Sequence, residues 1–331
     1  MVITKTPFRM SFFGGGTDIE CFFKEYGGAV ISTTFDKYCY VNVRHLPRFF
    51  DYSTELSYSK IERVTSVDDI THPAIRNAMK MLSMDGIRLT YEADLPARSG
   101  LGTSSSFAIG MLNAFYALKG IYVDKKRLAR EAIYLERDLC NEAGGWQDQI
   151  AASFGGFNRI NFNADGFEIY PIIISPEKKR QLNNNLMMFF TGFTRLSSEV
   201  QKINIINKGD RIKQLKDMLS LVDDAEKILT GQNQNLDEFG KLLDYTWKIK
   251  RRTGSAVTTD MIDELYLKGI KAGALGGKLL GAGGGGFLLF YVQPDKQENV
   301  RLAMNELMYI PFKFEDGGTR VIHYTPEIDM V

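Results

Sequence analysis

The chain has 331 residues, 44% of them hydrophobic and 24% charged, and its 41 basic and 40 acidic side chains leave a net charge of +1. This composition is typical of a globular protein with a large core, and it excludes a disordered or fibrous chain. Proteins that bind long nucleic acids or anionic membranes usually carry a large basic excess, so we expect neither partner. At about 150 residues per domain, the length predicts two domains.

The cysteines and the apolar runs indicate a cellular compartment. Three cysteines (Cys21, Cys39 and Cys140) are too few for a disulfide framework, and no pair has the spacing of metal ligands. The N-terminus lacks the long apolar stretch of a signal peptide. The longest apolar run, near 286–292, is far shorter than the roughly 18 residues that span a bilayer. We therefore expect a cytoplasmic protein.

The first half of the chain combines strand-like and helical patterns. Residue type and periodicity predict strands at 1–13, 27–46 (one strand or two), 87–94 and 156–173, and helices at about 107–120 and 125–140.

A polar, charged stretch at 175–185 marks a change in composition, so we predict domains at 1–178 and 179–331. In the second half, the pattern predicts a strand at 186–191, helices at about 209–230 and 235–252, a strand at 287–292 and a helix at about 295–308. Strands and helices mixed in two blocks predict an α+β fold.

The first segment with a chemical signal is RMSFFGGGTD, from Arg9 to Asp18, in which a predicted strand runs into three glycines. Consecutive glycines at a strand end let the backbone approach a ligand closely. The alternative is a glycine-rich turn followed by a solvated Asp18.

The second segment is GLGTSSS, residues 100–106, at the start of a predicted helix. Free N–H groups and the helix dipole attract phosphate there, and hydroxyl groups can bind phosphate or Mg²⁺. The alternative is helix capping by Thr103 or Ser104. Capping requires one hydroxyl, so four in succession favour phosphate binding.

The third segment is GGWQDQIAASFGG, residues 144–156, where Asp148 lies between two glutamines as a candidate general base. The alternative is that Asp148 caps the turn at 150–154. Upstream, Glu136 has no basic residue three or four positions away in its predicted helix. An unpaired acid near a phosphate loop is a candidate metal ligand, and a solvated glutamate is the alternative.

The fourth segment, GGKLLGAGGGG at 276–286, contains glycines with the spacing of a dinucleotide-binding motif. A predicted strand follows them where that motif requires a helix. The segment also fails the P-loop pattern, because Ala272 occupies the first glycine position and Leu279 follows Lys278.

Together these segments resemble the motifs of the GHMP kinase superfamily, which includes galactokinase and the homoserine, mevalonate and phosphomevalonate kinases. Residues 7–18 resemble its first motif, PARSGLGTSSS at 96–106 its phosphate loop, and 278–287 its third motif, in the family order. The resemblance implies an N-terminal domain like ribosomal protein S5 domain 2 and a C-terminal ferredoxin-like domain, with ATP in the cleft between them.

The resemblance also implies roles for individual residues. Asp148 matches the catalytic aspartate and Arg9 the arginine that galactokinases hold beside it, while Ser104 and Glu136 match the residues that bind Mg²⁺. The implied ATP-binding residues are Gly100, Leu101, Gly102, Thr103, Ser104, Ser105 and Ser106. The candidate sugar-binding residues are Gly15, Gly16, Thr17, Asp18, Gly283 and Gly284. For a substrate phosphate, the candidate cationic anchors are Arg98, Arg195 and Lys278, each with a solvated surface residue as the alternative.

The form of the first motif narrows the implied substrate. Gly14, Gly15 and Gly16 replace the Gly-Glu-His of galactokinases, and this form is more similar to sugar kinases of the heptose 7-phosphate type and to L-fucokinase-like enzymes. The resemblance thus implies transfer of the ATP γ-phosphoryl group to the anomeric hydroxyl of D-glycero-D-manno-heptose 7-phosphate. The product would be the 1,7-bisphosphate, on the way to nucleotide-activated heptose.

Two alternatives stay open: a kinase for another sugar such as L-fucose, and a catalytically silent sugar- or nucleotide-binding protein of the same fold. The presence of Arg9, Ser104, Glu136 and Asp148 together favours an enzyme. A homodimer is compatible with the sequence, which gives no sign of the residues that contact adenine.

Overall fold

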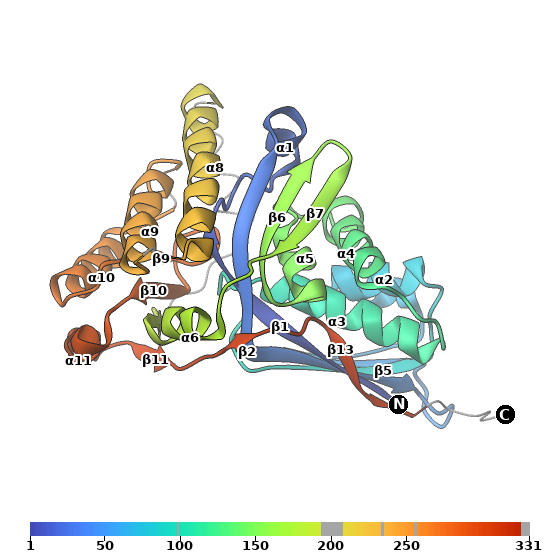
Figure 1. Cartoon of the computed structure of the whole chain (residues 1–331). Coiled ribbons are helices and arrows are strands. Elements are labelled where there is room, and N and C mark those ends of the chain that lie inside the picture. Colours follow the sequence, from blue (N-terminus) through green and yellow to red (C-terminus); the bar gives the residue numbers. More distant parts are fainter. Residues whose placement is uncertain (98, 193–207, 233–234, 255–256, 326–331) are drawn as a thin grey trace.

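The computed structural model describes residues 1–97, 99–192, 208–232, 235–254 and 257–325, and it contains two sheets with helices packed against them (Figure 1). The strands are β1 (Val2–Phe13), β2 (Gly28–His45), β3 (Thr54–Ser57), β4 (Ile61–Val64), β5 (Ile87–Ala93), β6 (Phe157–Asn163), β7 (Gly166–Pro171), β8 (Leu186–Phe190), β9 (Gly276–Leu279), β10 (Phe287–Tyr291), β11 (Met308–Ile310), β12 (Phe314–Glu315) and β13 (Arg320–Tyr324). The helices are α1 (Glu20–Tyr26), α2 (Pro73–Met81), α3 (Thr103–Leu118), α4 (Lys125–Tyr134), α5 (Gln147–Phe154), α6 (Pro176–Asn184), α8 (Lys208–Thr230), α9 (Asp237–Lys250), α10 (Asp260–Lys271) and α11 (Gln297–Ala303). Two short 3₁₀ turns, η1 (Val67–Asp69) and η3 (Pro294–Lys296), and a π-helix, η2 (Leu135–Leu139), complete the described elements.

The first sheet is built around β2. One edge of β2 pairs with β1 over most of its length, and its other edge pairs in succession with β6, β12 and β5. On its far edge β1 pairs with β13, so the two ends of the described chain lie side by side (Figure 1). The long predicted segment at 27–46 is therefore one strand, because partners from three parts of the chain satisfy its backbone.

Helix α3 packs against β1 and β2. It is apolar on almost every side, as expected for a helix covered by other elements on all faces. At Gly110 the helix approaches the sheet so closely that an added Cβ would lie 2.8 Å from Thr6 Oγ1. This close contact fixes the start of α3, which carries the predicted phosphate loop, relative to the end of β1.

The second sheet is antiparallel, with strand order β11-β8-β10-β9. Helices α8, α9 and α10 lie on the same side of the molecule as this sheet (Figure 1). Helix α9 packs closely on it, since a Cβ added at Gly276 would lie 1.9 Å from the carbonyl oxygen of Gly240. The C-terminal end of α9 is thereby held in a fixed position.

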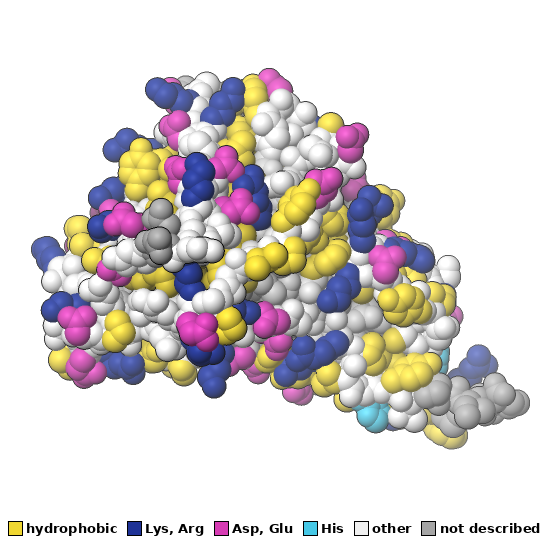
Figure 2. Space-filling model, in the orientation of Figure 1, with side chains coloured by type: hydrophobic (Ala, Val, Ile, Leu, Met, Phe, Trp, Pro, Cys, Tyr) yellow, Lys and Arg dark blue, Asp and Glu magenta, His cyan; other side chains and the backbone are white. Residues whose placement is uncertain are grey.

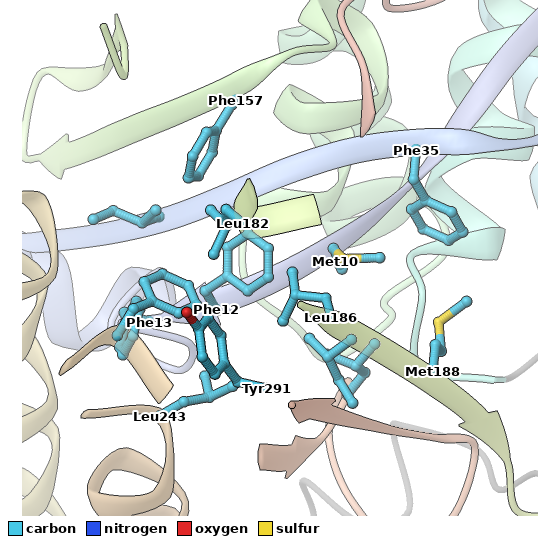
Figure 3. Close-up of a cluster of buried hydrophobic side chains, with 14 of the residues drawn as sticks. Met10, Phe12, Phe13, Phe35, Phe157, Leu182, Leu186, Met188, Leu243 and Tyr291 are labelled. Atoms are coloured by element: carbon cyan, nitrogen blue, oxygen red, sulfur yellow. The ribbon is translucent and has the colours of Figure 1, made fainter. Parts of the chain in front are cut away.

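One hydrophobic cluster joins the two sheets. Figure 3 shows Met10, Phe12, Phe13 and Phe35 of the first sheet facing side chains of the second half. The facing residues labelled there include Leu186, Met188, Leu243 and Tyr291. The ring of Phe12 lies edge-on to Phe239 of α9, with 5.3 Å between centroids. The two halves thus share a core, which fixes their relative orientation.

The predicted α+β fold is confirmed, and the predicted strands and helices are present with small shifts at their ends. The helix expected at 295–308 is shorter, because the chain leaves α11 after Ala303 and forms β11 beside β8. The pattern did not indicate the helices α1, α2, α6 and α10 or the strands β3, β4, β9, β11, β12 and β13. It predicted only a turn at 150–154, where the structure has helix α5. The boundary at 178/179 stays a prediction, and β12 and β13 return from the C-terminal segment to the first sheet.

The surface carries no large patch of one charge on the face in Figure 2, where basic and acidic side chains are interspersed. Among the described helices, none combines the length and apolar character that crossing a membrane requires.

The shared core generates a stability prediction. Replacing Phe12 with Ala removes a fully buried ring that contacts both halves, so the free energy of unfolding should fall by about 3–5 kcal/mol in urea denaturation. Phe49→Ala is the matched control, because that ring is 91% exposed and should change stability by less than about 0.5 kcal/mol. Equal effects of the two substitutions would contradict a core shared between the halves.

Candidate active site

Arg9 of β1 and Asp148 of α5 form an ion pair in which only the arginine is fully buried. Arg9 donates to Asp148 Oδ1 from Nε, and its Nη2 lies at the same 2.7 Å from that oxygen. Its Nη1 donates to the carbonyl of Gly100 at 2.7 Å. Asp148 lies in the first turn of α5, whose N-cap is Trp146, so the capping alternative for Asp148 is wrong. The pair leaves Asp148 partly exposed while Arg9 is buried, so the carboxylate is the member that a ligand can reach.

The segment at 100–106 forms a tight turn into α3. Gly102, with φ +71°, is the N-cap, and no side chain caps the helix, so capping by Thr103 or Ser104 is wrong. A Cβ at Gly102 would lie 3.4 Å from Asp148 Oδ2. The start of α3 therefore faces the Arg9–Asp148 pair without a capping side chain, in the arrangement that attracts an anion.

The serines of this turn have different partners. Ser106 is buried and donates to the carbonyl of Pro7 at 2.9 Å, which ties α3 to β1. Ser105 donates to Glu136 Oε2 at 2.7 Å and Ser104 to Oε1 at 3.0 Å. Of these three serines only Ser104 is exposed, so its hydroxyl is the one that a ligand can reach.

Glu136 is 2% exposed, so the solvated alternative for it is wrong. It lies in the π-helix η2, a distortion frequent at functional sites, which directs the carboxylate toward α3. Gln149 of α5 also donates to it.

The oxygen atoms of Glu136 and Ser104 form a donor set that fits Mg²⁺. Mg²⁺ is usually held by one or two carboxylates together with substrate phosphates. One carboxylate beside an exposed hydroxyl fits that pattern, and the described residues contain no group of three or more His, Cys, Asp or Glu side chains arranged for a metal. An ion here would depend on phosphate oxygens for its remaining ligands.

The glycine turn after β1 is held by Asp18 and Thr17. Asp18 accepts from the N–H groups of Gly16 at 2.9 Å and Gln147 at 3.3 Å, and it is buried, so the solvated alternative is wrong. Burial raises the pKa of Asp18, and the nearby charge of Asp148 raises it further. Thr17 is also buried and donates to the carbonyls of Gly14 and Ala29. Gly15 lies beside Ser11 and Gln147, whose Oγ and Oε1 atoms are buried without a protein partner.

The third glycine-rich segment packs backbone to backbone on the phosphate loop. A Cβ at Gly281 would lie 2.3 Å from Gly100 Cα, and one at Gly286 would lie 2.2 Å from the carbonyl oxygen of Ser99. Gly283 and Gly284 instead contact the backbone of Val257. Side chains at these contacts would push the loop away from the second sheet.

Of the three predicted cationic anchors for a substrate phosphate, the structure describes only Lys278. Arg98 and Arg195 lie outside the described residues. Lys278 is 2% exposed and donates to the carbonyls of Ser11 and Phe12, both at 2.8 Å, so the solvated alternative is wrong. Its ammonium thus links β9 to β1 by binding two backbone carbonyls. The sequence predicted instead that this ammonium binds a substrate phosphate.

Sequence patterns did not single out Lys250, at the end of α9, as part of the site. Its Nζ donates to the carbonyl of Gly281. Burial lowers the pKa of Lys250 to about 8, with a further lowering from the charge of Arg9. In the sequence, Lys250 belongs to a run of basic residues at 248–252, at the end of a predicted helix. Such a run ordinarily indicates a solvated helix end.

Two family models match the chain: the GHMP kinases N terminal domain over residues 69–156 and the GHMP kinases C terminal over 221–310. Together they cover more than half of it, and the chain belongs to the GHMP kinase family. It is an ATP-dependent sugar kinase.

Individual relatives agree with this. The chain is 29% identical to D-glycero-alpha-D-manno-heptose 7-phosphate kinase of Campylobacter jejuni, over 96% of this chain and 97% of that protein. It is 31% identical to L-fucokinase/L-fucose-1-P guanylyltransferase of Bacteroides fragilis, over 66% of this chain and 23% of that protein.

Among solved structures, a D-glycero-D-manno-heptose 1-phosphate kinase from Bacteroides thetaiotaomicron superposes with a TM-score of 0.79 at 23% identity, over 98% of this chain and 100% of that one. Methanococcus jannaschii mevalonate kinase gives a TM-score of 0.73 at 19% identity, over 95% and 98%. These two likenesses establish the fold.

The contact between Gly100 and the second sheet generates a prediction. Gly100→Ala places a Cβ 2.5 Å from the carbonyl oxygen of Leu280 at a φ of +82°, and should lower the free energy of unfolding by about 2–4 kcal/mol. Gly120→Ala is the control, because its φ of +69° carries the same strain but no atom lies within 4 Å, and it should cost about 1 kcal/mol. Urea denaturation compares the two, and equal losses would rule out the close contact.

Proposed function

We propose that the protein transfers the γ-phosphoryl group of ATP to the anomeric hydroxyl of D-glycero-D-manno-heptose 7-phosphate, giving the 1,7-bisphosphate. The relative from Campylobacter jejuni supports the sugar, since it matches over nearly the full length of both chains. The phosphoryl-transfer chemistry is supported by the position of Asp148 beside the start of α3, which no side chain of its N-cap residue covers. A Cβ added to Gly102, the N-cap of that helix, would lie 3.4 Å from Asp148 Oδ2.

The phosphates of ATP would lie on the turn at 100–106, because the first backbone N–H groups of a helix have no partner within it. Ser104 and Glu136 would hold Mg²⁺ together with phosphate oxygens. Mg²⁺ supplies neutralisation of the charge on the β- and γ-phosphates. Glu136 is the buried carboxylate that accepts from Ser104 in this turn.

In the transfer step the anomeric oxygen forms a bond to the γ-phosphorus, and the bond from that phosphorus to the β–γ bridging oxygen breaks. The hydroxyl proton passes to Asp148, whose exposed edge faces the start of α3. Arg9 fixes the orientation of the carboxylate through Nε and Nη2. Phosphoryl transfer depends mainly on such positioning and on charge neutralisation.

The sugar would contact the turn formed by Gly15, Gly16 and Asp18, beside the unpartnered oxygen atoms of Ser11 and Gln147. These buried polar atoms match the hydroxyl groups of a sugar, because each requires a hydrogen-bond partner. Gly145 must lack a side chain here, since a Cβ would lie 1.8 Å from Asp18 Oδ2. Arg98, Arg195 and Lys278 stay predicted anchors of the sugar phosphate.

The sugar assignment predicts a substrate preference. With ATP and Mg²⁺, ADP release should be fastest with heptose 7-phosphate, and slower by at least about 100-fold with free heptose, which lacks the anionic group. Heptose 1-phosphate should be inert because its anomeric oxygen is already esterified.

A preference for sugars without a terminal phosphate would contradict the assignment. Faster release with L-fucose would favour the alternative suggested by the Bacteroides fragilis relative.

The proposed role of Asp148 predicts a loss of rate. Asp148→Asn keeps an oxygen that accepts from Arg9 but removes the proton acceptor, so kcat should fall by about 10²–10⁴-fold. Asp165→Asn, at an exposed turn, is the control and should leave kcat unchanged. Thermal unfolding would verify that both variants are folded, and normal turnover by a folded Asp148→Asn enzyme would reject the role.

A further inference from the structure

Lys250 is held at the seam between the two halves. It ends α9, one turn after the fully buried Trp247, and its Nζ reaches the carbonyl of Gly281. Among the described residues no carboxylate forms an ion pair with Lys250. Lys248, two residues earlier, instead pairs with Asp244 at 2.6 Å and is 60% exposed. The two lysines therefore face different environments: one is solvated, and the other is directed into the protein.

A continuous series of contacts leads from Lys250 to the reacting groups. Gly281, which accepts from Lys250, touches Gly100 backbone to backbone. The carbonyl of Gly100 accepts from Arg9, which in turn holds Asp148. The ammonium of Lys250 thus lies where the second half meets the phosphate loop.

The charged residues near Lys250 do not compensate the positive charge of its ammonium. Arg9 is already paired with Asp148, and its charge lowers the pKa of Lys250, while Asp18 raises it. Lys278 is also nearby, and burial lowers the pKa of that lysine well below its ordinary value. Lys250 is half-buried, and among the described residues its ammonium has one carbonyl partner, which leaves two donor hydrogens. An ammonium in this position beside other cations is stabilised by a bound anion.

We propose that Lys250 donates to the γ-phosphoryl group of ATP and stabilises its charge during transfer, an inference that rests on the proposed phosphotransfer. The position of Lys250 selects this phosphate over that of the sugar. Its contacts lead to Gly100, Arg9 and Asp148, where the transferred group lies, whereas the 7-phosphate is at the other end of the sugar from the anomeric carbon. The phosphate loop of the first half thereby gains a cation from the second half.

The first test is nucleotide binding, which requires no sugar. Calorimetry with Mg²⁺ should give Lys250→Met an affinity for the ATP analogue AMP-PNP about 10-fold weaker than wild type, with ADP affinity within about 2-fold. Lys248→Met is the matched control on the same helix and should bind both nucleotides as wild type does. Unchanged AMP-PNP affinity in Lys250→Met, or equal weakening of both nucleotides, would overturn the proposal.

The second test is the pH profile with whichever sugar the wild-type enzyme phosphorylates. As pH rises through about 8, Lys250 loses its proton and its positive charge, so kcat/KM of the wild type should fall. Lys250→Arg should retain most activity without this fall, and Lys250→Met should lose at least about 100-fold in kcat. A basic limb near pH 8 that persists in Lys250→Arg would contradict the assignment to Lys250.

The two tests separate this inference from the sugar assignment. A wild-type enzyme inactive on heptose 7-phosphate would reject the sugar, while the comparison of AMP-PNP with ADP would still decide the role of Lys250. If Lys250→Met weakened binding of the sugar phosphate alone, the γ-phosphoryl contact would be rejected.

Discussion

The hydrophobic cluster between the two sheets is the interaction on which the active site depends. Phe12 and Phe13, the last residues of β1 before the turn that holds Asp18, pack against Phe239 of α9. The same strand carries Arg9, and the same helix ends at Lys250. Burial of these rings therefore stabilises the fold and also fixes the position of Arg9 relative to Lys250, two residues that come from different halves.

Close backbone contact is the second constraint. Gly100 and Gly281 contact each other through their backbones, because neither has a side chain. The third glycine-rich segment therefore packs directly against the loop at 100–106. The glycines of this protein thus have distinct uses. Gly102 leaves space for Arg9 and Asp148, Gly145 leaves space for Asp18, and Gly281 lets the two halves touch. A methyl group at any of these positions would displace either a charged side chain or the loop itself.

Much of the site was predictable from local sequence, because each motif places its residues on one short turn. The hydroxyl run after Gly102 and the strand ending in three glycines predicted two segments that the structure places beside Asp148 and Gln147. Their roles in binding phosphate and sugar stay predictions. Properties that depend on distant partners were not predictable. Glu136 is buried by α3 and α5, Lys278 is bound by β1, and Lys250 gains importance only through Gly281 and Arg9. The return of β13 to β1 joins the two ends of the described chain, which no local pattern indicates.

The central claim is that the anomeric oxygen of a phosphorylated heptose receives the γ-phosphoryl group. Phosphorus NMR of the product formed from ATP and heptose 7-phosphate tests it most directly. The account predicts a second phosphate monoester whose signal is coupled to the anomeric proton, with the original 7-phosphate signal retained. A new phosphate coupled to any other proton of the sugar, or hydrolysis of ATP without a new sugar phosphate, would contradict it.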